Sequence, residues 1–129
     1  MHLLPAERSD HRLIEGERVC NAIAGLDEPA AIRERARRFA LLADPTRLTL
    51  LTCIHAAGPI SVSDLAAATG IADTTVSQAL RHLRASQTVE ADRDGRVVRY
   101  RLADPTVAAL LDDAGAHDGV VPARPRHAT

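Results

Sequence analysis

The sequence predicts a mainly α-helical fold that carries one small β-hairpin. Of its 129 residues, 46% are apolar but only 2% are aromatic, so the core must be built from Leu, Ala, Val and Ile. Such a core suits closely packed helices better than a large sheet. Capping residues and helix breakers divide the chain into short segments of helical spacing, and one Asp94-Gly95 pair between two alternating segments predicts the hairpin.

The first predicted helices lie between residues 29 and 57. Pro29 suits the first turn of a helix, and Asp44-Pro45 ends that helix. The same pair starts the next helix, with Asp44 as the N-cap of that second helix. Gly58-Pro59 ends that second helix. Apolar residues recur at helical spacing in the first helix at Ile32, Ala36, Phe39, Ala40 and Ala43, and in the second at Leu48, Leu51 and Ile54.

Four more helices are predicted around the hairpin and at the start of the chain. Ser61 or Ser63 can cap a short helix that stops at Gly70, and Asp73 or Thr74 can cap the helix after it. Asp104-Pro105 starts a last helix, and a short helix is possible between residues 10 and 24. The apolar positions are Val76, Leu80 and Leu83 in the helix after Gly70, Val98, Tyr100 and Leu102 in the second strand, and Val107, Leu110, Leu111 and Ala114 in the last helix.

We expect three regions: an N-terminal arm or short helix at residues 1–28, one folded domain at 29–117, and a disordered tail at 118–129. The chain has no apolar run of bilayer length and no secretory signal pattern at its start, which predicts a cytoplasmic protein. Its two cysteines are too few for a disulfide framework.

Two short helices joined by Thr69-Gly70-Ile71 and followed by a basic hairpin form a winged helix-turn-helix, which binds DNA with its second helix in the major groove. The net charge is only −1, but residues 29–103 hold eleven arginines against seven acids. Arginine suits contact with phosphate. The candidate DNA-binding residues are Thr74, Thr75, Ser77, Gln78, Arg81 and His82 on the helix, and Arg93, Arg96 and Arg99 on the hairpin, with Arg101 beside them.

Three motifs in order resemble the ArsR/SmtB family of repressors. The run 39–48 contains its LADPTR signature, the segment 63–83 resembles its helix-turn-helix, and 95–104 resembles its wing. The similarity covers about residues 33–114. The resemblance implies a homodimer held by its first and last helices, which represses transcription at an operator and is released by an inducer. Inducers in the family are usually metal ions or arsenite, and some members sense persulfide.

The sequence departs from both main sensor sites of that family. Where the thiolate site needs a Cys-x-Cys-like pair, this chain has Ser61-Val62-Ser63, and hydroxyls are poor ligands for soft metals. The second site lies across the last helices of the dimer. Asp104 and His117 match two of its positions, whereas Thr106 and Val120 occupy the others. A divalent ion of the nickel, cobalt or zinc type is the inducer this half-site favours, with missing ligands supplied by Asp113, His2, His11 or Cys20.

Other functions remain open at this point. Cys20 and Cys53 would permit a thiol- or arsenite-responsive repressor, and the net charge of −1 permits a ligand-free winged helix that binds proteins. We do not expect an enzyme, because the sequence has no nucleophile elbow, Gly-rich phosphate loop or paired zinc ligands.

Overall fold

The computed structural model describes residues 14–113 and divides the chain into two compact units, Met1–Arg37 and Arg38–Thr129. In the first unit, helix α1 spans Gly16–Ala24. The helix expected between residues 10 and 24 is therefore confirmed from Gly16 onward, and residues before 14 lie outside the described part. Helix α2, Pro29–Leu42, begins at the expected proline and continues across the boundary between the units.

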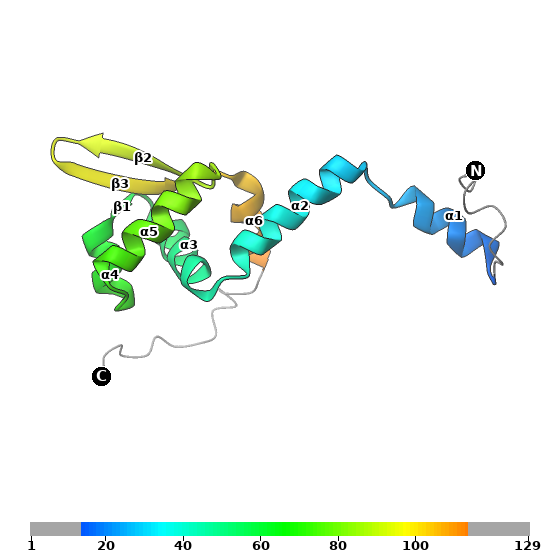
Figure 1. Cartoon of the computed structure of the whole chain (residues 1–129), viewed down its shortest axis with the longest axis horizontal. Coiled ribbons are helices and arrows are strands. Elements are labelled where there is room, and N and C mark those ends of the chain that lie inside the picture. Colours follow the sequence, from blue (N-terminus) through cyan, green and yellow to red (C-terminus); the bar gives the residue numbers. More distant parts are fainter. Residues whose placement is uncertain (1–13, 114–129) are drawn as a thin grey trace. The chain divides into compact units, whose positions relative to one another are not determined.

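The second unit contains the winged helix-turn-helix (Figure 1). Helices α3 (Pro45–Ala57), α4 (Val62–Thr69) and α5 (Asp73–Ala85) precede the hairpin, and α6 (Pro105–Asp113) follows it. The hairpin strands are β2 (Val89–Asp94) and β3 (Val97–Leu102), and a two-residue strand β1 (Ile60–Ser61) pairs antiparallel with β3. The sheet order is β1-β3-β2.

The core of this unit is aliphatic, as the composition predicts. Leu50, Leu51 and Ile54 of α3 are buried together with apolar residues of α4, α5 and α6. Leu48 was expected in the core but is 39% exposed, because the buried side of α3 runs through positions 50, 51 and 54. The other buried apolar side chains are Leu65, Val76, Leu80, Leu83, Val89, Val107 and Leu111.

Side-chain caps begin three of the helices in this unit. The Asp44 carboxylate accepts the Arg47 N–H at 3.0 Å, the Ser61 hydroxyl accepts the Asp64 N–H at 3.2 Å, and the Asp104 carboxylate accepts the Thr106 N–H at 2.9 Å. The cap expected at Asp73 or Thr74 is wrong. Helix α5 already includes Asp73, and its N-cap is Ala72, whose side chain has no acceptor. As the first residue of α5, the Asp73 carboxylate still interacts favourably with the positive end of the helix dipole.

Glycines permit the two sharp turns. Gly70 ends α4 with φ +77° and Gly95 starts the hairpin turn with φ +65°, both in the region that side chains with a Cβ disfavour. The pairing of Asp94 with Val97 leaves Gly95 and Arg96 as the two turn residues. The sequence placed Asp94 in the turn instead, but glycine is favoured at the first position of a II′ turn, which shifts the turn by one residue.

The last helix differs from expectation in what it exposes. Val107 and Leu111 are buried in the chain's own core and Leu110 is half-buried, so α6 presents a narrower apolar surface than its pattern predicts. Ala114 and the expected tail at 118–129 lie outside the described residues. Within residues 14–113, no helix has the length and apolar character needed to cross a membrane.

Candidate nucleic-acid interface

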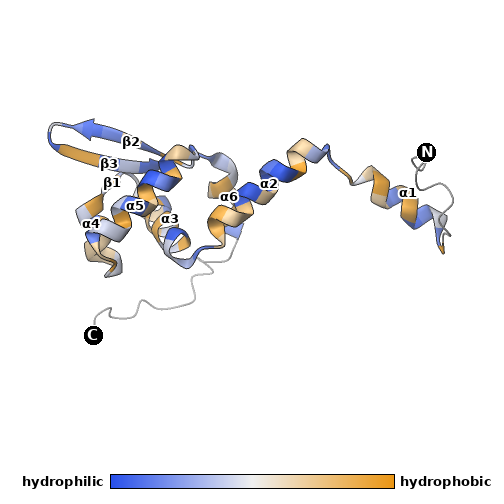
Figure 2. Cartoon of the chain, in the orientation of Figure 1, coloured by the Kyte–Doolittle hydropathy of each residue, from blue (hydrophilic) through white to orange (hydrophobic). Residues whose placement is uncertain are grey.

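Helix α5 presents a polar face to solvent. Val76, Leu80 and Leu83 are completely buried, and this one-sided burial turns the opposite face outward. Figure 2 shows the resulting alternation of polar and apolar residues along α5. Of the six residues predicted to face DNA, Ser77 is half-buried and the others are exposed, namely Thr74, Thr75, Gln78, Arg81 and His82.

The wing and the start of α5 border one hollow. Its volume is about 550 Å³, and it is lined by the first turns of α4 and α5 and by the beginning of β3. Arg96 and Arg99 therefore lie on the side of the unit where α5 begins, while Asp64 and Asp73 line the same hollow. Of α5, only Asp73 lines this hollow, so the two wing arginines lie beside the first residue of the helix.

The wing arginines are not equivalent. The Arg101 guanidinium pairs with Glu90 at 2.6 Å and with Asp92 at 2.8 Å across the hairpin. The hydrogen bond with Asp92 and the charges of both acids raise the pKa of Arg101 above its usual value. Arg99 lies 3.4 Å from Asp94.

Arg96, at the tip, is exposed and has no acid within ion-pair distance among residues 14–113. Arg93 is also exposed, and its guanidinium reaches the Gly95 carbonyl at 3.4 Å. Within the wing, the positive charge available to phosphate is therefore concentrated at Arg93 and Arg96.

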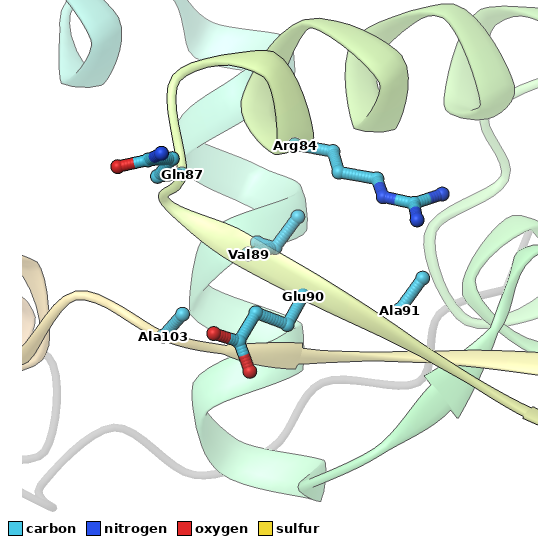
Figure 3. A pocket seen from close by; sticks show the side chains of 6 residues that line it. All are labelled: Arg84, Gln87, Val89, Glu90, Ala91 and Ala103. Carbon is cyan, nitrogen blue, oxygen red and sulfur yellow. The ribbon is translucent and has the colours of Figure 1, made fainter.

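The flank of α5 beside β2 forms a different surface. Figure 3 shows Arg84 beside β2, over a shallow hollow of about 590 Å³ that it shares with Gln87, Val89 and Glu90. Arg84 is three residues after Arg81 and lines this hollow beside β2. It therefore serves as a matched control for Arg81.

Two structural supports of this interface were missed by sequence reasoning. Strand β1 joins the start of α4 to the wing through the pairs Ile60–Tyr100 and Ser61–Arg99. Two residues give too short a pattern to reveal a strand. The Arg47 Nε donates to the carbonyl oxygen of Leu41 at 3.1 Å, so this arginine binds the end of α2 while its own N–H is capped by Asp44.

Asp104, a predicted metal ligand, has both carboxylate oxygens engaged. Oδ1 accepts the N–H groups of Thr106 at 2.9 Å and Val107 at 3.4 Å, and Oδ2 accepts Nε of Arg38 at 2.9 Å. Burial opposes ionisation of this carboxyl, but the bond from Arg38 and the backbone bonds outweigh burial and hold its pKa below the usual value. A metal ion bound here would have to displace Arg38.

The other predicted sensor residues in the described part lie on three different helices. Asp113 is exposed at the end of α6, and Cys20 and Cys53 are half-buried on α1 and α3. His2, His11 and His117 lie outside the described residues. Within residues 14–113, no three His, Cys, Asp or Glu side chains are grouped closely enough to hold a metal ion.

Comparisons with known proteins agree with this geometry. A family model described as a helix-turn-helix domain matches residues 42–87. The HTH-type transcriptional regulator NmtR of Mycobacterium tuberculosis (strain ATCC 25618 / H37Rv) is 45% identical over 94 residues, which cover 73% of this chain and 77% of NmtR. The transcriptional repressor SmtB homolog of Synechocystis sp. (strain ATCC 27184 / PCC 6803 / Kazusa) is 40% identical over 85 residues, covering 66% of this chain and 64% of the homolog.

Among solved structures, the antimony-specific transcriptional repressor AntR matches with a TM-score of 0.64 and 31% identity, covering 88% of this chain and 91% of AntR. The fold and the exposed face of α5 define a winged helix-turn-helix DNA-binding protein. The chain belongs to the ArsR/SmtB family of transcriptional repressors, as its three motifs predict. It is a DNA-binding repressor and not an enzyme.

Proposed function

We propose that α5 enters the major groove and reads bases with Gln78 and Arg81. The observation that carries this assignment is the exposed polar face of α5, which holds no acid after Asp73. Glutamine can bond adenine and arginine can bond guanine through two hydrogen bonds each. Thr74 and Thr75 are near the helix start, where hydroxyls and backbone N–H groups suit phosphate.

In this proposal, Arg93 and Arg96 of the wing contact phosphates beside the groove. Ser77 and His82 border the polar face and add contacts to the backbone. Arg99 and Arg101 contribute less than the sequence suggests, because acids of the hairpin already offset their charges. The wing's contribution to the salt dependence of DNA affinity therefore comes mainly from the two phosphate contacts of Arg93 and Arg96.

We infer that the repressor acts as a homodimer on a near-palindromic operator. Apolar side chains remain exposed on α2, where Ile32 is 43% and Phe39 is 51% exposed, and a second copy would cover them. Two recognition helices would then meet half-sites about 10 base pairs, or a multiple of that, apart. The burial of Val107 and Leu111 leaves α6 a smaller share of this interface.

We further propose a metal or metalloid ion as the inducer. The related repressor AntR is antimony-specific, which supports this class of ligand. A thiol-responsive mechanism through Cys20 and Cys53 is the alternative, and it predicts that replacing both cysteines with serine abolishes the response.

Sedimentation of the protein with DNA from upstream of its own gene tests the proposal. We expect two chains per operator fragment and a dimer without DNA at micromolar concentration. A single chain on a fragment that carries the whole binding site would refute the dimer, and no preference for this DNA over an unrelated fragment would refute operator binding.

A further inference from the structure

The carboxylate at the start of α5 is not engaged by the helix that it begins. Asp73 is the first residue of α5 and is exposed, and the N-cap before it is Ala72. Within residues 14–113, no hydrogen bond or ion pair holds the Asp73 side chain. All three acids of the wing, by contrast, are paired with arginines. Asp73 therefore offers two hydrogen-bond acceptors and a full negative charge to whatever α5 contacts.

Asp73 lies on the side of α5 that we propose reads bases. Residues four positions apart follow one face of a helix, so this face continues from Asp73 through Ser77 to Arg81. The N-terminal residues of a recognition helix are the ones that contact base edges. Asp73 also lines the hollow that Arg96 and Arg99 of the wing share. Its carboxylate is thus placed between the helix face and the wing, where the duplex would lie.

A carboxylate in this position finds few favourable partners on DNA. Phosphates repel it, and the duplex carries one negative charge for about every 1.7 Å of its axis. In the major groove, guanine presents two acceptors, thymine an acceptor and a methyl group, and adenine an acceptor beside its amino group. Cytosine presents only the N4 amino group, which is a donor. Cytosine is therefore the base that suits a carboxylate best.

We propose that Asp73 reads one cytosine for each recognition helix, with a carboxylate oxygen accepting a hydrogen bond from the N4 amino group. This inference rests on the proposed function, because it requires α5 in the major groove. Arg81 lies eight residues later, about 12 Å along the helix axis, so the two side chains read different base pairs. The contact adds to specificity more than to affinity, because repulsion between the carboxylate and the phosphates offsets it.

Selection of binding sites from random double-stranded DNA, carried out with the full chain and its variants, tests this assignment. The wild type should prefer cytosine at a position where Asp73→Ala accepts all four bases. Asp73→Asn should prefer adenine there, because asparagine bonds adenine through two hydrogen bonds. In fluorescence anisotropy, replacing that cytosine in the selected site should weaken wild-type binding about 5- to 140-fold and Asp73→Ala binding by less than about twofold.

Asp64→Asn is the matched control, because it removes the other acid of the same hollow but lies on α4. It should keep the wild-type base preferences, and circular dichroism confirms that each variant is folded. Loss of the cytosine preference in Asp64→Asn to the same extent as in Asp73→Asn would overturn the proposal, because the effect would then come from the charge of the hollow.

Uniform effects of the Asp73 variants would also overturn it. If Asp73→Ala and Asp73→Asn keep the wild-type base preferences, whether or not they bind every sequence more tightly, the acid does not read a base. Loss of preference for a base other than cytosine would refute the assignment as well. If Gln78→Ala alters the selected sequence and neither Asp73 variant does, only this inference fails. If the wild type enriches no sequence, the reading of bases by α5 fails with it.

Discussion

Replacing Asp104 in two ways separates its roles as helix cap and as ion-pair partner. Asp104→Asn keeps an oxygen that accepts the N–H groups at the start of α6, because asparagine caps helices about as well as aspartate. It removes the charge that faces Arg38 at 2.9 Å. Asp104→Ala removes both interactions.

The expected losses follow from burial and geometry. The side chains of Arg38 and Asp104 are 30% and 16% exposed, which places the pair between an exposed ion pair of about 0.2–1 kcal/mol and a buried one of about 3–5 kcal/mol. We expect Asp104→Asn to lower the free energy of unfolding by about 1–2 kcal/mol. Loss of the cap adds about 1 kcal/mol in Asp104→Ala.

Urea unfolding at pH 7, followed by circular dichroism, measures both differences. In the folded state the pKa of Asp104 lies below its usual value, so the ionised carboxylate stabilises the folded protein. This contribution is complete at pH values above the usual, unfolded-state pKa. It disappears as the pH falls through the folded-state pKa. The gap between wild type and Asp104→Asn should therefore close in acid. If Asp104→Ala changes stability by less than about 0.5 kcal/mol, as an exposed surface substitution does, the reasoning is refuted.

The remaining predictions concern the wing and a turn. Arg96→Ala should reduce the slope of log affinity for DNA against log salt by about 1, whereas Arg101→Ala should change it less because Glu90 and Asp92 already pair with Arg101; equal flattening in both variants would contradict the assignment. Gly70→Ala should destabilise the protein by about 1–2 kcal/mol in urea unfolding, because φ is +77° there while no neighbouring atom lies within 4 Å of an added Cβ. Gly70→Asn should cost less, since asparagine tolerates this conformation, and equal stability of all three chains would show that the turn is not strained.

Sequence patterns were sufficient for the elements that depend on local chemistry. Asp44-Pro45 and Gly70 fixed helix boundaries because a cap, a restricted φ and a positive φ act within a few residues. The hairpin followed from alternation and one glycine. The cap of α5 was misplaced because Asp73 suits both the N-cap and the first turn, and sequence alone does not separate the two.

Contacts between distant residues could not be predicted in this way. Arg38 and Asp104 are 66 positions apart, and His55 and Asp112 are 57 apart, so no local pattern joins them. The same limit applies to the wing, where all four arginines look alike in sequence. Only the pairing of β2 with β3 shows that Arg101 faces Glu90 and Asp92 while Arg96 stays exposed at the tip.

The central claim, that the exposed face of α5 reads DNA sequence, is tested most directly by the ratio of affinities for two DNA fragments. One comes from upstream of the protein's own gene and the other is unrelated, and fluorescence anisotropy at fixed salt gives both affinities. Gln78→Ala and Arg81→Ala should each reduce the difference in binding free energy between the two fragments by about 1–3 kcal/mol. Arg84→Ala, on the flank beside β2, should leave that difference unchanged. If Gln78→Ala and Arg81→Ala keep the wild-type ratio, α5 does not read the operator through this face.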